Sequence, residues 1–244
     1  MNAVNRILPA VVVAVLLCPA PAAAQWYAGT YVGANHNSPS DIATNEPSSH
    51  ASLVFHDETF ESQPFHWPLF WGARIGRLFH GKRFGIEVEE LHLKVITRTD
   101  LPVHVTGTIN GAAFETTVPM NLFVQRYNMT HGLNFLVANF VVRIPTAFRM
   151  SGRPATIVLR AGGGQTFSGT DTQVAAGLVE GYQRSGPGAQ AAAGIDVPIG
   201  RGWSGIVDYK FTYARPTISL ADGTGHMTAI ASSIGFGLML GFAR

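Results

Sequence analysis

The sequence contains little cysteine and few charged residues. Its 244 residues include one cysteine, Cys18, in the N-terminal apolar segment, so a chain exported without that segment has no disulfide to stabilise it. Charged residues make up 13% of the chain, against about 25% in typical soluble domains. The 17 basic and 15 acidic residues nearly balance and form no basic block, which argues against a nucleic-acid partner.

Long apolar runs are missing too, with one short exception near the N-terminus. Residues 7–17 are apolar, Arg6 precedes them, and the alanines at 22–24 fit a signal-peptide cleavage site. This run is shorter than the roughly 20 apolar residues that a membrane-spanning helix needs. A lipoprotein anchor at Cys18 is disfavoured, because Leu17 stands where a small residue is expected. We predict a cleaved signal peptide at residues 1–24 and one mature domain at residues 25–244.

The sequence is rich in glycine, with 27 residues, and in apolar side chains that alternate along short segments. Alternation with a period of two is typical of β-strands, and segments of about ten residues suit the strands of a membrane barrel. Eight such segments lie at residues 26–36, 70–79, 84–96, 130–143, 155–167, 188–199, 203–214 and 227–242. We therefore predict an all-β fold, an eight-stranded antiparallel up-and-down transmembrane β-barrel with long extracellular loops. A secreted sandwich or a lipocalin-like barrel is the alternative that alternation alone does not exclude.

The four-residue turn at 80–83 sets the expected pairing of the second and third strands. In that register Arg74 meets Glu89, and Ile75 meets Val88 on the face that suits lipid. Opposite charges on the other face would pair inside the barrel, where lone charges are costly. The predicted lumen charge cluster comprises Arg74, Glu87, Glu89, Arg160, Asp196, Asp208 and Lys210. Because the apolar parity changes after Val88, a β-bulge is expected near residues 89–90.

The segment "GFGLMLGF" at 235–242 resembles the C-terminal recognition strand of bacterial outer-membrane barrels, although Ala243 and Arg244 follow the aromatic Phe242 that is usually last. Together with "WYAGTYVGA" and "VDYKFTY", the chain resembles the eight-stranded outer-membrane barrel family, of the OmpA and OmpX transmembrane type. The resemblance implies a location in the outer membrane of a Gram-negative bacterium. It also implies contact with outer-membrane lipids and lipopolysaccharide, and insertion by the barrel-insertion machinery.

A second resemblance concerns "LVFHDETFESQPFHWPLFWGARIG" and the following "FGIEVEELHLKV". These segments are similar to outer-membrane lipid A oxidases, which implies oxygen-dependent oxidation of the proximal glucosamine of lipid A. The candidate catalytic residues are His56, Asp57, Glu89 and His92. Imidazole and carboxylate ligands suit a divalent metal such as Fe, Mn or Zn, and the candidate metal ligands are His56, Asp57 and His66. Their spacing matches no short metal-binding motif.

Two functional hypotheses follow, and they differ in geometry. A small outer-membrane barrel with an envelope-structural or surface-interaction role needs no cofactor, and it predicts that His56 points into water and that Glu89 pairs with Arg74. A lipid A-modifying enzyme predicts that His56, Asp57, Glu89 and His92 converge near the outer rim around a metal. A small porin is disfavoured, because eight strands leave little room inside once the interior side chains are in place.

Overall fold

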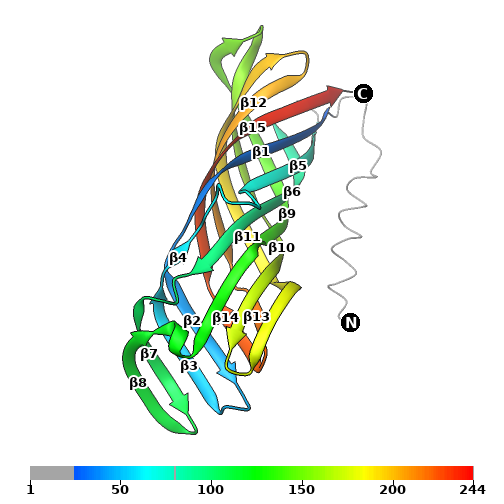
Figure 1. Cartoon of the computed structure of the whole chain (residues 1–244). Coiled ribbons are helices and arrows are strands. Elements are labelled where there is room, and N and C mark those ends of the chain that lie inside the picture. Colours follow the sequence, from blue (N-terminus) through cyan, green and yellow to red (C-terminus); the bar gives the residue numbers. More distant parts are fainter. Residues whose placement is uncertain (1–24, 80, 244) are drawn as a thin grey trace, which may run out of the picture.

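A computed structural model describes residues 25–79 and 81–243 and consists of two β-sheets (Figure 1). The predicted signal peptide at 1–24 lies outside the described residues. One sheet closes into a barrel, and the other lies at the end of the barrel opposite the C-terminus. Among the residues described, no helix is long and apolar enough to cross a membrane.

The barrel has eight antiparallel strands, and the predicted fold class is confirmed in its strand number and its up-and-down order. Each strand pairs with the next barrel strand along the chain, and the first pairs with the last, from Gln25 opposite Ala243 to Asn37 opposite Ala231. A closed ring leaves no unpaired barrel edge. The barrel strands are β1 (Gln25–Asn37), β5 (Trp71–Leu78), β6 (Phe84–Thr97), β9 (Val124–Met150), β10 (Arg153–Val174), β11 (Gly177–Gly200), β12 (Trp203–Ala214) and β15 (Ala229–Ala243).

Three of these strands are longer than the sequence pattern predicts. The segment 168–185, which lies between the predicted strands 155–167 and 188–199, is paired strand rather than loop, because β10 and β11 continue as a hairpin to Val174 opposite Gly177. At the other end β9 runs on to Met150, so only Ser151 and Gly152 form the turn that was expected to occupy residues 144–154.

The register of β5 and β6 is confirmed, with Arg74 opposite Glu89 and Ile75 opposite Val88. The bulge expected near residues 89–90 is wrong. This pairing continues without a shift to Trp71 opposite His92, and the irregularity falls after Leu93, where β6 pairs with β9. The apolar parity changes after Val88 because the interior itself changes character: Leu91 and Leu93 face inward like Glu89, but in an apolar layer.

The second sheet, which we call the outer sheet, is assembled from three loops that connect barrel strands. Its order is β13-β14-β2-β3-β7-β8. The segment 37–68 was expected to be a polar connection, but most of it is ordered strand. The outer-sheet strands are β2 (Ser40–Glu46), β3 (Ala51–Glu58), β7 (Pro102–Ile109), β8 (Ala112–Pro119), β13 (Thr217–Leu220) and β14 (Gly223–Met227); the short β4 (Phe60–Glu61) pairs with β6, and the 3-10 helix η1 is Met120–Leu122.

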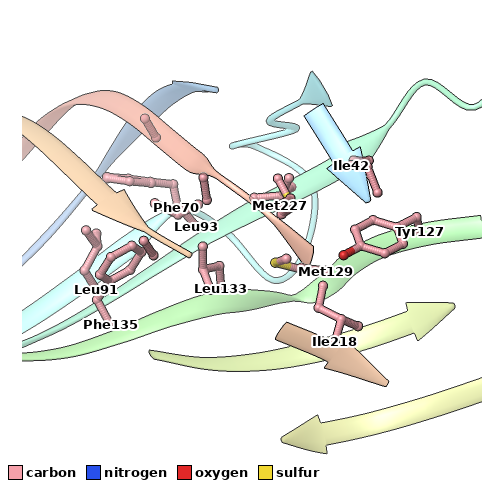
Figure 2. Packing of buried hydrophobic residues seen from close by; sticks show 14 of the residues in the cluster. Ile42, Phe70, Leu91, Leu93, Tyr127, Met129, Leu133, Phe135, Ile218 and Met227 are labelled. Atoms are coloured by element: carbon pink, nitrogen blue, oxygen red, sulfur yellow. The ribbon is translucent and has the colours of Figure 1, made fainter. Parts of the chain in front are cut away.

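One hydrophobic core joins the outer sheet to the end of the barrel nearest to it (Figure 2). Leu91, Leu133 and Phe135 lie in the barrel part, and Ile42 and Ile218 lie on outer-sheet strands. Burial of apolar surface is the main favourable term in folding. The outer sheet is therefore packed onto the barrel as one body with it.

The outside of the barrel is apolar along the half that is nearer the C-terminus. Large apolar side chains, each 36% to 59% exposed, alternate along the strands with buried polar side chains. This arrangement is the reverse of that in a soluble barrel, whose exterior is polar. These outward side chains, which we call the belt, are Ile75, Phe84, Phe140, Ile157, Leu159, Ile195, Val207, Tyr209, Phe211, Ile234, Phe236, Leu238 and Phe242.

Candidate functional site

Charged side chains fill the half of the barrel interior that is nearer the C-terminus. Arg74 donates to Asp208 at 2.5 Å and lies 3.3 Å from a Glu89 oxygen, while Lys210 donates to the same carboxylate of Glu89 at 2.7 Å. Arg160 bridges Glu87 at 3.2 Å and Asp208 at 2.9 Å. The structure thus brings together the residues of the predicted lumen cluster, and we call them the charged layer: Arg74, Glu87, Glu89, Arg160, Asp196, Asp208 and Lys210.

Arg143 completes the charge balance of this layer, because it lies 3.1 Å from Asp196. With Arg143 there are four cations and four carboxylates, so the formal charge is zero. Burying charges is tolerable only when each is paired and hydrogen-bonded. Every carboxylate of the charged layer has a cation within salt-bridge distance.

Two tyrosines that were not predicted as site residues donate hydrogen bonds to carboxylates of the charged layer. Tyr27 donates to Glu87 at 3.0 Å and Tyr31 donates to Glu89 at 2.7 Å. The guanidinium of Arg74 also lies over the Tyr31 ring, 4.7 Å from its centroid, a cation–π contact. One sequence feature indicates that these tyrosines face the barrel interior. Both share a strand face with glycines, which suits an interior rather than a lipid-facing position.

Glycines opposite the two tyrosines explain how such large rings fit inside a narrow barrel. Tyr27 pairs with Gly76 and Tyr31 pairs with Gly72 across β1 and β5. A Cβ added at Gly72 would lie 2.1 Å from the Tyr31 ring, so the ring occupies the space that any larger residue would need. This aromatic-over-glycine packing turns the hydroxyls toward the charged layer.

The predicted catalytic residues do not come together. Glu89 lies inside the barrel, whereas His92, three residues further along β6, is on the opposite face of the strand and is buried there, stacked on the Trp71 ring and 2.8 Å from Asn134. Strand residues an odd number apart face opposite sides. Both lie on a barrel strand, whereas His56 and Asp57 lie on β3 of the outer sheet.

His56 is held by outer-sheet neighbours instead. Its Nδ1 lies 3.2 Å from Asp41, its Nε2 lies 2.8 Å from the Thr106 hydroxyl, and its ring stacks on His104. Asp57 occupies a positive φ of 54° at an irregularity in the β2–β3 pairing, and its backbone N–H donates to Asp41. These contacts make His56 and Asp57 part of the hydrogen bonding of the outer sheet.

The expected metal site does not form either. His66 is exposed, and the contact it makes to Lys94 is through its backbone carbonyl, not its imidazole. Over residues 25–79 and 81–243, no three His, Cys, Asp or Glu side chains are grouped so that they could hold a metal ion. The reason is that His56 and Asp57 belong to the outer sheet, whereas His66 lies in the connection back to the barrel.

Glu58 is a chemically unusual residue that sequence analysis did not single out. Its side chain is fully buried, and neither carboxylate oxygen has a hydrogen-bond partner among the described residues. Burial raises its pKa to about 7; the charge of Asp100 acts in the same direction, and the Thr59 backbone N–H opposes it. Continued alternation from Leu53 and Phe55 would turn Asp57 inward, but the irregularity at Asp57 turns Glu58 inward instead.

The closed ring, the filled interior and the apolar belt define the class of fold as an eight-stranded barrel of the outer-membrane type. No protein-family model matches the sequence, and no curated protein matches it.

Several solved outer-membrane proteins are similar to the chain in structure. Ail of Yersinia pestis, solved with the heparin analogue sucrose octasulfate, is 10% identical with a TM-score of 0.38 and covers 89% of this chain and 99% of its own. OprG of Pseudomonas aeruginosa is 9% identical, with a TM-score of 0.41 and coverages of 92% and 99%. The outer-membrane protease OmpT of Escherichia coli is 7% identical, with a TM-score of 0.43 and coverages of 89% and 97%. Because one fold hosts many functions, these likenesses assign no activity.

Proposed function

We propose that the protein spans the outer membrane of a Gram-negative bacterium as a closed, non-conducting barrel and acts at the cell surface through its outer sheet. Contact with outer-membrane lipids and lipopolysaccharide, and insertion by the barrel-insertion machinery, belong to this proposal. The role is surface interaction rather than catalysis or transport.

The belt supports the membrane location. Thirteen large apolar or aromatic side chains point outward from the barrel wall, and such a continuous surface is stable in hydrocarbon rather than in water. The closed strand ring satisfies the backbone N–H and C=O groups of the wall internally, as a bilayer requires.

The filled interior supports the absence of a pore. The charged layer occupies the half of the barrel nearer the C-terminus, and the apolar core with Leu91, Leu133 and Phe135 fills the part nearer the outer sheet. Eight strands enclose an interior just wide enough for side chains to fill. Ions would therefore meet two packed layers in series.

The single observation that carries the surface role is the outer sheet itself. Three loops far apart in sequence are built into one sheet, with Met227 paired to Ile42 and Ala51 paired to Ile109. A rigid sheet that shares a core with the barrel presents one defined surface, which suits recognition of a partner.

Its free edge is the most suitable contact surface. At the β13 edge the barrel wall covers the sheet, since Thr172 donates to the Ser219 carbonyl at 2.9 Å and Ser219 donates to Gln183 at 2.8 Å. At the other end of the sheet, β8 pairs with β7 alone among the described strands, and most of its residues are exposed or half-exposed. An uncovered edge strand presents backbone groups that can pair with an extended segment of another protein.

The test replaces the hairpin at 103–118 by a short Gly-Ser turn and measures adhesion of whole cells that carry the variant. We expect adhesion to fall while the barrel keeps its heat-modifiable mobility on gels. The matched control shortens the hairpin at the opposite end, at 147–154, and should leave adhesion unchanged. Equal adhesion of cells carrying the parent chain and the 103–118 variant would refute the surface role, and a steady open-channel conductance of the parent chain in planar bilayers would refute the closed barrel.

A further inference from the structure

An apolar groove of about 250 Å³ lies against the outer wall of the barrel and is not used by the proposed surface role. One side is formed by the outward faces of β1 and β15, and the other by the segment 64–70, which crosses over them. The lining is Val32, Gly33, Ala34, Pro64, Phe65, Leu69, Phe70, Ile234 and Phe236.

We propose that this groove binds one hydrocarbon chain of an outer-leaflet membrane lipid. The inference rests on the membrane-spanning part of the proposed function but not on the surface role. A cavity of 150 Å³ with an apolar lining already admits benzene, so 250 Å³ accommodates a substantial part of an extended chain.

The groove is continuous with the belt and sits at the end of its apolar surface nearest the outer sheet on these strands. Two outward pairs, Val32 with Phe236 and Ala34 with Ile234, form its floor. The next outward pair in the same register is polar, His36 with Ser232. A lipid chain lying on the floor would therefore have its hydrocarbon part against the belt and its polar end at the level of His36.

The segment 64–70 is held over the wall by specific hydrogen bonds. The ammonium of Lys94 donates to the backbone carbonyls of His66 at 3.0 Å and Trp67 at 3.1 Å, and the Phe70 N–H donates to the Pro64 carbonyl at 2.9 Å. Phe65 remains 76% exposed. An apolar ligand in the groove would explain why an aromatic side chain beside it is so exposed. In a membrane the apolar ligand that is available is a lipid acyl chain.

The test is native mass spectrometry of the protein refolded in detergent micelles and titrated with 1-palmitoyl lysophosphatidylcholine. We expect one retained lipid per barrel. Ala34→Phe fills the groove floor and should lower retention at least tenfold. Gly205→Phe is the matched control, because it adds the same side chain on the outer wall where a Cβ at Gly205 meets no atom within 4 Å, and it should retain the lipid.

Each other outcome has a definite meaning. We expect Phe65→Ser to weaken retention of the lipid. This variant changes an exposed side chain that the barrel does not need for folding, so it tests the proposal if Ala34→Phe fails to fold. The proposal is overturned if no lipid is retained, if several lipids bind in all variants as an adventitious additive only, or if a second copy of the chain replaces the lipid. Retention of glycerophosphocholine, which has no chain, would also overturn it. Loss of heat-modifiable mobility in the parent protein would instead refute the membrane barrel of the proposed function.

Discussion

Replacing Arg74 by methionine removes one cation from the centre of the charged layer. In the parent protein Arg74 lies 2.5 Å from an Asp208 oxygen and 3.3 Å from a Glu89 oxygen, and its own side chain and that of Glu89 are completely buried. The variant leaves three cations facing four carboxylates. Breaking a buried ion pair by removing one partner typically costs about 3–5 kcal/mol, because the remaining charge is uncompensated.

We expect the loss for Arg74→Met to lie at the lower end of that range. Glu89 keeps Lys210 at 2.7 Å and Asp208 keeps Arg160 at 2.9 Å, so each orphaned carboxylate retains a second cation. A decrease of about 3 kcal/mol in the free energy of unfolding is therefore predicted. The measurement is urea unfolding of the protein in phosphatidylcholine vesicles, followed by tryptophan fluorescence.

A second variant separates charge imbalance from lost packing. Adding Glu89→Gln to Arg74→Met restores three cations and three carboxylates, so the double variant should lose less than the sum of the two single variants. Ile75→Met, on the same strand but on the lipid-facing side, is the control and should change stability by less than about 0.5 kcal/mol. If Arg74→Met is as stable as Ile75→Met, the charged layer does not stabilise the barrel in the way described.

Three further predictions concern other parts of the molecule. Because burial raises the pKa of Glu58 to about 7 from 4.5, the contribution of this one group to stability is fully present below pH 4.5 and falls by about 1–3 kcal/mol as the pH rises through 7; hydrogen exchange of the outer sheet should follow this fall, and Glu58→Gln should abolish it. Gly72→Ala should destabilise the barrel by about 1–3 kcal/mol in the same urea assay, since its Cβ would overlap the Tyr31 ring, whereas Gly205→Ala should be neutral; equal stability of the two variants would contradict the packing of tyrosine over glycine. Replacing the hairpin at 103–118 should leave the lack of conductance unchanged, and an open channel in that variant would show that the outer sheet, not the filled interior, closes the barrel.

Local alternation and turn length were enough to determine the barrel. The four-residue turn at 80–83 left one plausible register for β5 and β6, and that register placed Arg74 opposite Glu89. A side chain in a strand has two possible faces, so once the apolar face is assigned to lipid the charged residues must face inward. Tyr27 and Tyr31 were within reach of the same argument, because they alternate with glycine on one face.

The outer sheet was decided by tertiary structure. Ile42 pairs with Met227, which lies far away along the chain, and no local sequence pattern predicts such a pairing. Between Glu89 and the outer sheet the barrel interior changes from charged to apolar, and this change depends on which side chains of other strands lie at the same level along the barrel axis. Sequence alone does not show that change, so the apolar residues Leu91 and Leu93 suggested a bulge that does not exist.

The candidate catalytic site failed for the same physical reason. The side chains suit a catalytic site chemically, namely those of His56, Asp57, Glu89 and His92. Their chemistry can be read from the sequence, but whether they come together depends on the tertiary structure. Strand alternation sends Glu89 into the barrel and His92 outward, and pairing with β2 and β7 holds His56 in another sheet. The sequence alone thus determined the wall of this protein and the charges inside it, because both follow from a period of two. Only the tertiary structure decided what the loops build, because their strands find partners far away along the chain.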